Sequence, residues 1–538
     1  MRITLNDEEL ITLDEARERL SKLIRRQVVE VNLLDSLNFI SAEEVYANIN
    51  LPPFSRSTVD GYAIKSELSP GDFAVIDKVE IGEAKEVKVE GRQAVEVDTG
   101  SILPHGANAV VKVEDTSRRE NHLLVGRKVN PWDNVAIIGS DISKSTMILG
   151  KGERISAYKV SLLASQGISK VRVYKPMSVS IIITGNEIIE PGVNSYFAPK
   201  IFDSNGYFLQ AAFKEMGSTV IRRVYVTDVR EKVEKEILTA LNDSDLIITV
   251  GGTSAGERDY VNKILIEKGT IIFYGIDIKP GKPTIASLIN DKVVVGLPGN
   301  PVSATIVFEE LVKSILDFTE RREIIANSLN EIKGDRRRDA FLPAILLRGK
   351  SQVYAYLPPF DSYMIGAFTL SDGYVHLRRG ESVNVNEPVS VKLINTFSGY
   401  TVIGEEEPSL SFSGISRILY AGSSVACEAM KRGVGDVLII SSEICEPKEF
   451  DFEIKRKIVR VGSGESVGYI DGVGISKFVD SPSIKVKSPS AALSLSEDKT
   501  VYLPSTFGIK GEEVGEETIY VVINESELKG KVGVRRNL

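Results

Sequence analysis

Three short apolar runs in the middle of the chain each end in a turn that contains glycine. Glycine lets backbone N–H groups approach an anion closely, and the first turn of a following helix favours negative charge. One such turn is a weak signal because glycine is a common turn former, but three at one sheet edge predict a site for a phosphate-bearing ligand. The runs and their turns are 178–183 with Thr184-Gly185-Asn186-Glu187, 246–250 with Gly251-Gly252-Thr253-Ser254, and 293–295 with Gly296-Leu297-Pro298-Gly299-Asn300-Pro301.

A basic loop lies in the same part of the chain. Lys279 and Lys282 stand in the segment Ile278-Lys279-Pro280-Gly281-Lys282-Pro283-Thr284. Its two prolines restrict the backbone, which limits the flexibility of an otherwise mobile basic turn. The pattern allows an anion clamp or a solvated turn, and we favour the clamp because the glycine turns lie in the same predicted domain.

Four carboxylates are candidates for the opposite role. Glu187, Asp228 and Asp259 follow predicted strands, whereas Asp60 lies in the separate segment 52–63. Carboxylates beside a phosphate repel it unless a hard cation such as Mg²⁺ joins them, and together they would predict metal-assisted transfer at a phosphate. An isolated aspartate at a turn is more often a cap, and sequence reasoning alone does not bring Asp60 to the other three.

Histidine and cysteine are scarce. His105, His122 and His376 are the only histidines, and each is expected at the surface or in a loop, so catalysis must depend on carboxylates, lysines, hydroxyls and backbone amides. Cys427 and Cys445 are the only cysteines, too few for a disulfide scaffold or a four-ligand zinc site. Cys427 is expected to be a small buried apolar residue.

The composition excludes several classes of protein. A chain of 538 residues predicts three or four domains, and 66 basic against 74 acidic residues give a net charge of −8. That balance argues against a nucleic-acid-binding protein and against one that lies on an anionic membrane. There is neither an apolar run long enough to span a membrane nor the core of a signal peptide, so the expected location is the cytoplasm.

Hydrophobic periodicity predicts the elements that position these residues. Thr12 and Glu15 have the spacing of a helix-capping box, which predicts a helix over 12–26. Short strands at 72–76, 86–89 and 109–113 predict small β-rich domains, and from about residue 175 strands alternate with helices, as in a doubly wound α/β domain with a parallel sheet. The expected strands are 178–183, 219–226, 246–250, 270–274 and two short strands up to 295; the expected helices are 205–216, 229–241, 260–268 and 301–318.

The last third of the chain returns to β-rich patterns. Residues 331–395 fit a small barrel or sandwich, and 396–538 are mixed, with strands expected at 418–420, 437–440, 457–461 and 518–523. The predicted fold is therefore a multidomain α/β plus β protein, with a central doubly wound α/β domain, flanking β-rich N-terminal domains, a small C-terminal β-barrel and a mixed α/β tail. The predicted domains are 1–176 (with an inserted β domain at about 46–148), 177–325, 326–395 and 396–538.

The motifs occur in the order found in a known family. Taken together they resemble the molybdopterin molybdenumtransferase family, the MoeA or gephyrin E-domain type, over roughly residues 10–395. Besides the turns and the basic loop, the residues that carry this resemblance are Pro53-Phe54, Asp60-Gly61-Tyr62-Ala63, Asp98-Thr99-Gly100, the segment 104–111, Asp203-Ser204-Asn205, Gly256-Glu257-Arg258-Asp259-Tyr260 and Val302-Ser303-Ala304.

The resemblance implies that the central doubly wound α/β domain is a molybdopterin-binding domain, and it implies a reaction and a set of roles. Molybdenum would be inserted from its oxyanion into adenylylated molybdopterin, AMP would leave, and molybdenum cofactor would form. It also implies a homodimer in which the Asp60 segment of one subunit reaches the α/β domain of the other, with molybdopterin adenylyltransferase as a possible further partner. Asp60, Glu187, Asp228 and Asp259 would hold Mg²⁺ and promote catalysis, while Thr99, Gly251, Gly252, Ser254, Lys279, Lys282, Pro298 and Pro301 would bind the substrate.

The chain also departs from the family pattern. Asn186 replaces the usual aspartate, Pro343 follows the basic run 336–338 and its aromatic residue, and Gly366-Ala367 replace an expected serine pair. Molybdate and tungstate remain alternative substrates because they share charge and nearly share size. A molybdopterin-binding scaffold and a molybdopterin adenylyltransferase remain alternative functions.

The tail has a resemblance of its own. Residues 422–438 resemble part of the periplasmic-binding-protein-like domain that some archaeal members carry, in which a Gly-Ser pair opens a helix and can hold an anion. The other interpretation is a degenerate structural or interaction module.

Overall fold

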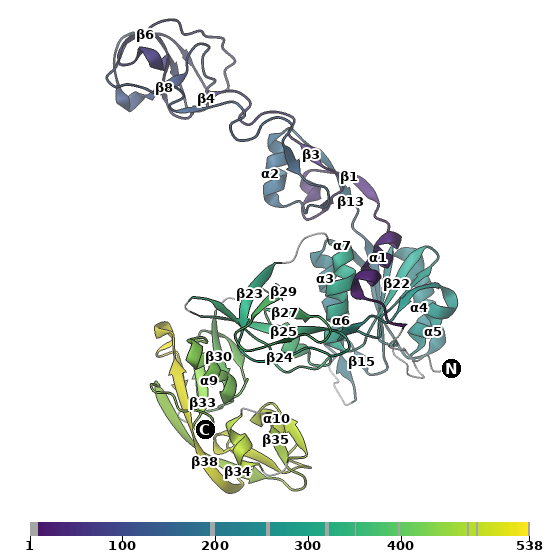
Figure 1. The fold of residues 1–538 in the computed structure, drawn as a ribbon. Coiled ribbons are helices and arrows are strands. Elements are labelled where there is room, and N and C mark those ends of the chain that lie inside the picture. The colour runs from purple at the N-terminus through teal and green to yellow at the C-terminus, as the bar shows by residue number, and fades with distance from the viewer. Residues whose placement is uncertain are drawn as a thin grey trace.

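The chain forms an elongated series of domains. The computed structural model describes residues 9–193, 199–253, 259–317, 322–349, 351–395, 399–470, 473–479 and 482–535. A β-rich domain projects from one end, a small stalk joins it to the central α/β domain, and a barrel connects the centre to the C-terminal module (Figure 1). No helix in these described ranges is long and apolar enough to cross a membrane.

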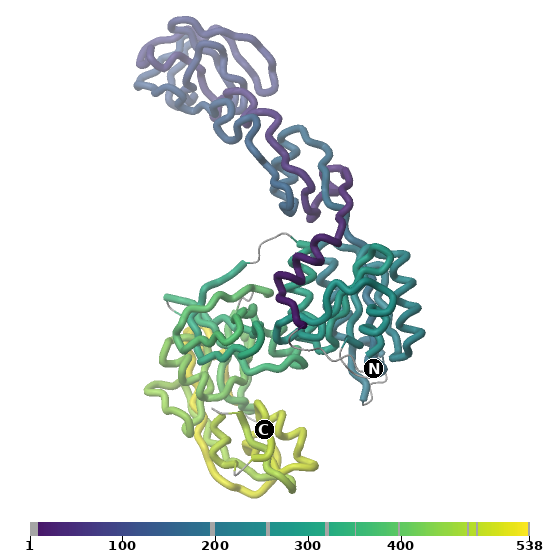
Figure 2. The backbone as a smooth tube through the Cα atoms, turned by 45° about the vertical axis from the view of Figure 1, so that its right-hand side comes forward, coloured from purple at the N-terminus to yellow at the C-terminus, as the bar shows by residue number. Residues whose placement is uncertain are grey.

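The N-terminal helix packs on the α/β domain. α1 (Leu13–Leu23) begins after Thr12, whose side chain accepts a hydrogen bond from the Glu15 N–H, and this confirms the predicted cap. Leu13, Ala16 and Leu20 are buried in the core of the α/β domain. The chain then leaves that domain for the stalk and returns to it about 150 residues later, as the tube in Figure 2 shows.

The stalk and the projecting domain are β-rich. In the stalk, β13 (Lys170–Tyr174) pairs with β1 (Val28–Asn32) and β2 (Ile40–Ser41), and α2 (Ala157–Ser165) covers them. The strand predicted at 86–89 is wrong: Val89 donates to the His105 carbonyl, and only a single bridge forms at Lys88, because the facing segment is a loop. The projecting sheet has the order β8 (Ala109–Lys112), β5 (Gly61–Ile64), β7 (Gln93–Val97), β6 (Gly71–Val79), β10 (His122–Val125), β9 (Thr116–Arg119). Smaller pairs are β3 (Val45–Tyr46) with β12 (Met147–Leu149) and β4 (Arg56–Ser57) with β11 (Val135–Ala136).

The central domain is doubly wound, as predicted. Four strands are parallel, with α3 (Asn205–Glu215) and α6 (Pro301–Val307) packed in the core on one face and α4 (Arg230–Asp243) and α5 (Tyr260–Lys268) in the core on the other. After α6 the helix continues as a π-helical segment, Phe308–Lys313, and then as α7 (Ser314–Leu316). The strand order is β17 (Thr219–Val226), β14 (Ser178–Thr184), β18 (Leu246–Val250), β22 (Lys292–Leu297), β21 (Ile285–Ile289), β19 (Thr270–Tyr274).

The sheet is not wholly parallel, which corrects the prediction. β21 and β22 form an antiparallel hairpin in which Ile289 lies opposite Lys292. Asn290 and Asp291, the two turn residues, both have positive φ, at 48° and 60°. A two-residue turn with this backbone reverses the chain at once, so β22 cannot follow β21 in parallel.

The barrel closes on itself. β25 (Asp339–Arg348) pairs with β27 (Gly373–Leu377) and completes a ring of five strands, so the domain is a barrel and not a sandwich. β20 (Ile278–Lys279), which belongs to the basic loop, adds to β25 in parallel and ties this loop to the barrel. The other elements are β23 (Glu323–Ser328), β24 (Ile332–Lys333), β26 (Val353–Tyr356), α8 (Ile365–Thr369), β28 (Ser382–Val383) and β29 (Pro388–Leu393).

The C-terminal module has two lobes. A mixed sheet with α9 (Ser423–Arg432) forms the first lobe. The second lobe has its own hydrophobic core, which includes β37 (Val501–Pro504), α10 (Pro489–Leu493) and the short pair β35 (Val467–Tyr469) and β36 (Ile484–Val486). The sheet order is β32 (Ile415–Leu419), β30 (Tyr400–Gly404), β33 (Val437–Ser441), β38 (Glu512–Ile523), β34 (Phe452–Val461), β37 (Val501–Pro504). β31 (Leu410–Phe412) pairs with β39 (Val532–Val534).

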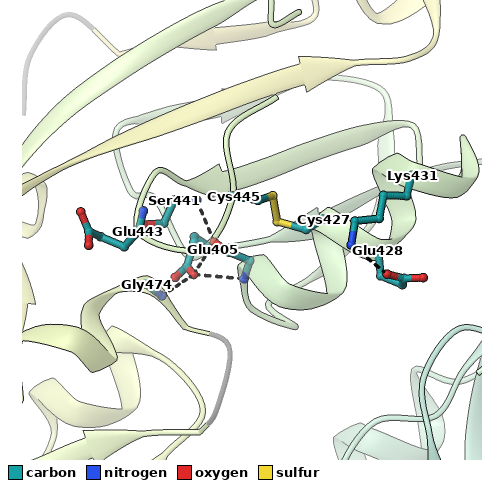
Figure 3. The surroundings of a disulfide bond; sticks show 9 residues. Glu405, Cys427, Glu428, Lys431, Ser441, Glu443, Cys445 and Gly474 are labelled. Atoms are coloured by element: carbon teal, nitrogen blue, oxygen red, sulfur yellow. Dashed lines mark hydrogen bonds and ion pairs between the residues drawn. A yellow bond between two sulfur atoms is a disulfide. The ribbon is translucent and has the colours of Figure 1, made fainter. Parts of the chain in front are cut away.

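The two cysteines form a disulfide, which corrects the sequence prediction. Cys427 of α9 is buried, as expected, but it is bonded to Cys445 in the loop after β33 (Figure 3). The sequence separation of 18 residues did not indicate this pairing, which arises because β33 returns the chain alongside α9.

Candidate functional site

A cavity of about 1350 Å³ lies at the carboxyl ends of β14, β18 and β22. These strands are neighbours and parallel, so the turns that follow them meet at one edge of the sheet, as the sequence predicts. All three turns line the cavity, which the barrel and the C-terminal module also help to enclose.

Hydrogen bonds connect the three turns to one another. The Thr184 hydroxyl donates to the Val250 carbonyl over 3.2 Å, which joins the first turn to the second. The Gly251 N–H donates to the Leu297 carbonyl over 3.0 Å, which joins the second turn to the third. Gly251 has φ of +87°, and a Cβ placed there would lie 2.8 Å from the Thr184 carbonyl oxygen, so only glycine fits this close approach.

The third turn also contacts the barrel side of the cavity. Asn205, at the start of α3, donates to the Gly299 carbonyl over 2.7 Å. Asn300 donates to the Ser362 hydroxyl over 2.8 Å, and the Val302 N–H donates to the Ser362 carbonyl. Pro298 and Pro301 line the cavity on either side of these contacts, and Pro301 is the first residue of α6.

The predicted basic loop lies in the cavity wall. Lys279 and Lys282 both line the cavity. Lys279 also forms an ion pair of 2.8 Å with Asp335 of the barrel, which holds the pKa of that carboxyl below its usual range. The Lys279 ammonium therefore lies at the boundary between the α/β domain and the barrel, paired with Asp335 at the wall of the cavity.

Three of the four predicted carboxylates share the cavity. Glu187 follows β14, Asp228 follows β17 and Asp259 immediately precedes α5, and all three line the cavity. Asp228 accepts a hydrogen bond of 3.2 Å from the Asn186 N–H, and its own N–H donates to the Asn186 side-chain oxygen over 3.1 Å. The amide oxygen of Asn186 thus accepts the bond that an aspartate could accept, without adding a charge beside Asp228.

Asp60 and Thr99 lie together, but in the projecting β domain. The Asp60 carboxylate accepts hydrogen bonds from the Thr99 N–H, at 2.6 Å, and from its hydroxyl, at 2.9 Å. These bonds lower the pKa of Asp60. Neither residue lines the cavity, and Figure 1 shows their domain far from the α/β sheet of the same chain.

The predicted set is therefore divided. Within the described ranges of a single chain, no group of three or more histidine, cysteine or carboxylate side chains is arranged to hold a metal ion. The carboxylate oxygens of Glu187, Asp228 and Asp259 are chemically suited to Mg²⁺, but they lack Asp60 as a neighbour. Ser254, predicted to bind substrate, lies outside the described residues.

Sequence reasoning missed several cavity residues. Asp203 is buried, accepts hydrogen bonds from the Gly206 N–H over 2.8 Å and the Tyr225 hydroxyl over 3.0 Å, and orients the start of α3. The available signal was the Asp203-Ser204-Asn205 motif at the start of a predicted helix. Lys333 and Arg338 of the barrel also line the cavity, and the basic run 336–338 was the available signal.

The departures from the family pattern lie beside the cavity and not in its lining. Pro343 is buried in β25, opposite Tyr374 of β27; on the other edge of β25 it lies between the part that pairs with β20 and the part that pairs with β26. Leu342 lines the cavity instead. Gly366 and Ala367 lie in α8, which is not part of the lining, whereas Ser362, shortly before them, is.

Comparisons with known families match these regions of the chain. Residues 11–167 match "MoeA N-terminal region (domain I and II)", residues 180–317 match "Probable molybdopterin binding domain", and residues 326–394 match "MoeA C-terminal region (domain IV)". The matched residues end before the C-terminal module.

Individual relatives agree with the family matches. A molybdopterin biosynthesis protein of Methanocaldococcus jannaschii is 33% identical over 71% of this chain and 97% of its own length. The molybdopterin molybdenumtransferase of Haemophilus influenzae is 32% identical over 72% of this chain and its entire length. The crystal structure of a Pyrococcus horikoshii MoeA protein, 32% identical, superimposes with a TM-score of 0.63 over 72% of this chain and all of its own. The chain therefore belongs to the MoeA family of molybdopterin molybdenumtransferases.

Proposed function

We propose that this protein inserts molybdenum or tungsten from the oxyanion into adenylylated molybdopterin and releases AMP. The observation that carries the proposal is the meeting of three glycine turns, two lysines and three carboxylates in one cavity. Backbone N–H groups and lysines suit the phosphate groups of such a substrate, while carboxylates suit a cation that accompanies it.

The residues divide the work by charge. Gly251, Gly252 and Ser254 of the second turn, with Lys279 and Lys282, bind the anionic part of the substrate; Pro298 and Pro301 shape the adjoining wall. Glu187, Asp228 and Asp259, completed by Asp60, hold Mg²⁺. When bound, that ion neutralises charge on the phosphate being cleaved.

The active unit is a homodimer. Asp60 and Thr99 lie outside the cavity of their own chain, in a domain that projects away from it (Figure 1). A projecting domain of this kind can reach the cavity of a second copy, and two-fold symmetry then builds two equal sites.

The enzyme works in the cytoplasm and receives its adenylylated substrate from molybdopterin adenylyltransferase. We divide the chain into the domains 1–176, 177–325, 326–395 and 396–538, although α1, within the first of these, packs into the core of the second.

AMP release tests the reaction directly. Purified protein is incubated with adenylylated molybdopterin and Mg²⁺ and titrated separately with molybdate and tungstate. We expect AMP to appear only when one oxyanion is present, and the more effective oxyanion identifies the metal. Molybdopterin that binds tightly without AMP release would instead favour the scaffold function. Formation of the adenylylated pterin from ATP would favour the adenylyltransferase function.

A further inference from the structure

The second lobe of the C-terminal module contacts a loop in the wall of the cavity. This loop, residues 358–364, joins β26 to α8, and its residues 358–363 line the cavity. Lys487, between β36 and α10, donates to the Pro359 carbonyl over 2.9 Å and to the Met364 sulfur over 3.4 Å. We propose that Lys487 is a positioning residue through which the C-terminal module holds this loop in the geometry that the reaction needs. The inference rests on the proposed function, because it assigns a role in that same cavity.

The loop supports the third glycine turn. The Ser362 hydroxyl accepts a hydrogen bond of 2.8 Å from the Asn300 side chain, and the Ser362 carbonyl accepts one of 3.0 Å from the Val302 N–H. Val302 lies in the first turn of α6, where backbone N–H groups have no partner within the helix. The Asn300 side chain, which precedes that turn, makes no capping bond to it. Ser362 therefore supplies the missing partner, and a shift of the loop would move a turn that lines the cavity.

The two contacts of Lys487 lie on either side of Ser362. Between them, the Met364 N–H donates to the Asp361 carbonyl over 2.9 Å, and the Ser362 N–H donates to the Asp361 carboxylate over 2.6 Å. These bonds form a tight turn, and Lys487 holds Pro359 before it and Met364 within it. The backbone that carries Ser362 is thus restrained from both sides by one side chain of the second lobe.

The backbone around Lys487 is itself fixed. The carbonyl of Val486, its preceding neighbour, accepts a hydrogen bond of 2.9 Å from the Ile470 N–H. Ser488, its following neighbour, caps α10 by accepting a bond from the Ala491 N–H. Lys487 therefore lies between the end of a paired strand and the start of a capped helix.

The ammonium of Lys487 is directed to the loop and not to a carboxylate. The side chain is partly buried, and burial lowers its pKa below the ordinary value of 10.5. Among the residues that the structure describes, no carboxylate forms an ion pair with it. Burying part of an ammonium is unfavourable unless it donates hydrogen bonds, so the contact with the Pro359 carbonyl stabilises this arrangement.

The first lobe is attached rigidly to the barrel. Ile345, Leu347 and Tyr354 of the barrel are buried in one cluster with residues of α9, β30 and β33. Arg417 of β32 also contacts Asp372 of the barrel over 2.8 Å, and both side chains are less than a tenth exposed. A module tethered only by a linker would not share such a core, so the first lobe has a defined position relative to the barrel.

The two lobes are in turn joined to each other. Glu405 is buried and accepts hydrogen bonds from Ser423, at the start of α9, and from the Gly474 N–H in the second lobe (Figure 3). Ser490 of α10 donates from its N–H to Glu406 over 3.0 Å. The position of Lys487 relative to the loop is therefore set by the whole module.

Kinetics of matched lysine variants test this role. Lys487→Met keeps the length of the side chain but removes the donor. Lys499→Met is the control, because Lys499 is a partly buried lysine of the same lobe that donates to Glu465 over 2.8 Å and does not line the cavity. We expect kcat/KM for AMP release to fall about tenfold or more in Lys487→Met, since small displacements of positioning groups are costly, and to be unchanged in Lys499→Met.

The conservative variant and a double-mutant cycle test the route. Lys487→Arg keeps a charged donor and should stay within about threefold of the wild-type kcat/KM. If Lys487 acts through Ser362, the loss in the double variant of Lys487→Met with Ser362→Ala should be smaller than the product of the two single losses. A loss in the double variant equal to that product, or no recovery in Lys487→Arg, would contradict the route.

Amide hydrogen exchange of the full chain without substrate measures the loop directly. In Lys487→Met, peptides that contain Met364 and Val302 should exchange about fivefold faster or more, because the loop opens more often. Exchange at Ile470 should not change, which shows that the second lobe keeps its fold. Lys499→Met should exchange as the wild type does at all three positions.

These measurements separate the inference from the proposed reaction. Unchanged exchange at Met364 and Val302 in Lys487→Met would overturn the inference, and so would faster exchange with an unchanged kcat/KM. A wild-type protein that releases no AMP would contradict the proposed function, while the exchange result would still decide whether Lys487 holds the loop.

Discussion

Two regions of the molecule place a glycine turn between a strand and a helix, yet only one is open to a ligand. In the α/β domain, Gly251 and Gly252 follow β18 and line the large cavity. In the C-terminal module, Gly422 lies between β32 and α9, and the start of the helix is occupied by Glu405. Similar local geometry thus forms part of an open cavity or a structural joint, depending on whether another side chain of the protein fills the position.

The largest effect is expected from substitutions of the acidic residues proposed for the open site. Asp60→Ala and Glu187→Ala should each reduce AMP release by about 10²–10⁴-fold, as is typical when a group acting at the reacting atoms is removed. Asp115→Ala, in the same domain as Asp60 and paired with Arg127 at the surface, is the matched control. Circular dichroism and thermal unfolding check that each variant folds.

Mixing those two variants also tests the dimer. A heterodimer of Asp60→Ala and Glu187→Ala contains one site with both lesions and one without either, so random mixing should recover about a quarter of the wild-type activity. Wild-type-like activity of either variant alone would exclude its carboxylate from the reaction. No recovery from verified heterodimers would place Asp60 outside the site of the second subunit.

The next effect is expected at the glycine of the open turn. Gly251→Ala places a Cβ at a positive φ, 2.8 Å from the Thr184 carbonyl oxygen, so it should lower the free energy of unfolding by about 1–3 kcal/mol and weaken substrate binding. Gly433→Ala, also at positive φ but with nothing near its added Cβ, is the control. That variant should lose about 1 kcal/mol of stability with KM unchanged. Equal KM values for both variants would contradict a binding role for the turn.

Removing the Glu405 side chain should leave the start of α9 open to an anion, as the glycine turn after β18 is. Glu405→Ala leaves the N–H groups of Ser423 and Gly474 without their carboxylate, so the free energy of unfolding should fall by about 1–3 kcal/mol. Sulfate should then raise the Tm of this variant more than that of the wild type. Glu443→Ala, a nearby glutamate paired with Lys477, should respond to sulfate as the wild type does. An identical sulfate response in all three proteins would show that the joint cannot hold an anion.

The smallest effect concerns pH. Burial raises the pKa of Glu405 above its ordinary value of 4.5, although Arg456 and the bond from Gly474 oppose this change. The native state therefore keeps the proton to a higher pH than the unfolded chain. The resulting stability is present below pH 4.5 and is lost as the pH rises through the native pKa, with a slope of at most about 1.4 kcal/mol per pH unit.

The conservative variant isolates this contribution. In Glu405→Gln the group does not titrate, so the wild type should lose stability relative to it as the pH rises from 4.5. Urea unfolding at a series of pH values measures the difference. A constant difference between the two proteins would show that Glu405 has the same pKa in both states.

Local sequence patterns predicted much of the α/β domain. The limits of β17, β18, β19 and α5 agree with the prediction, because alternation of apolar runs and amphipathic segments is decided by neighbouring residues. The meeting of the three turns also followed from a general rule for parallel strands. The exception is the pair Asn290-Asp291, which is typical of a tight hairpin turn and indicates that β21 and β22 are antiparallel.

The remaining features depend on contacts between distant residues. Nothing near Glu405 in the sequence indicates that it would bond to Gly474, 69 residues away. The separation of Asp60 from the other carboxylates follows from the length of the stalk and not from the spacing of the motif. Likewise, the pairing of Cys427 with Cys445 required the position of β33 beside α9.

During synthesis, α1 is made long before the residues against which it packs. Arg17 in this helix forms an ion pair with Glu310, 293 residues later, and its apolar face packs into a core that includes Ile315. At translation rates of about 5–20 residues per second, α1 emerges roughly 15–60 s before those partners exist. The stalk and the projecting domain lie wholly within that interval and can fold first. A nascent chain at this stage exposes Leu13, Ala16 and Leu20, so a chaperone that covers apolar helices would have its longest opportunity there.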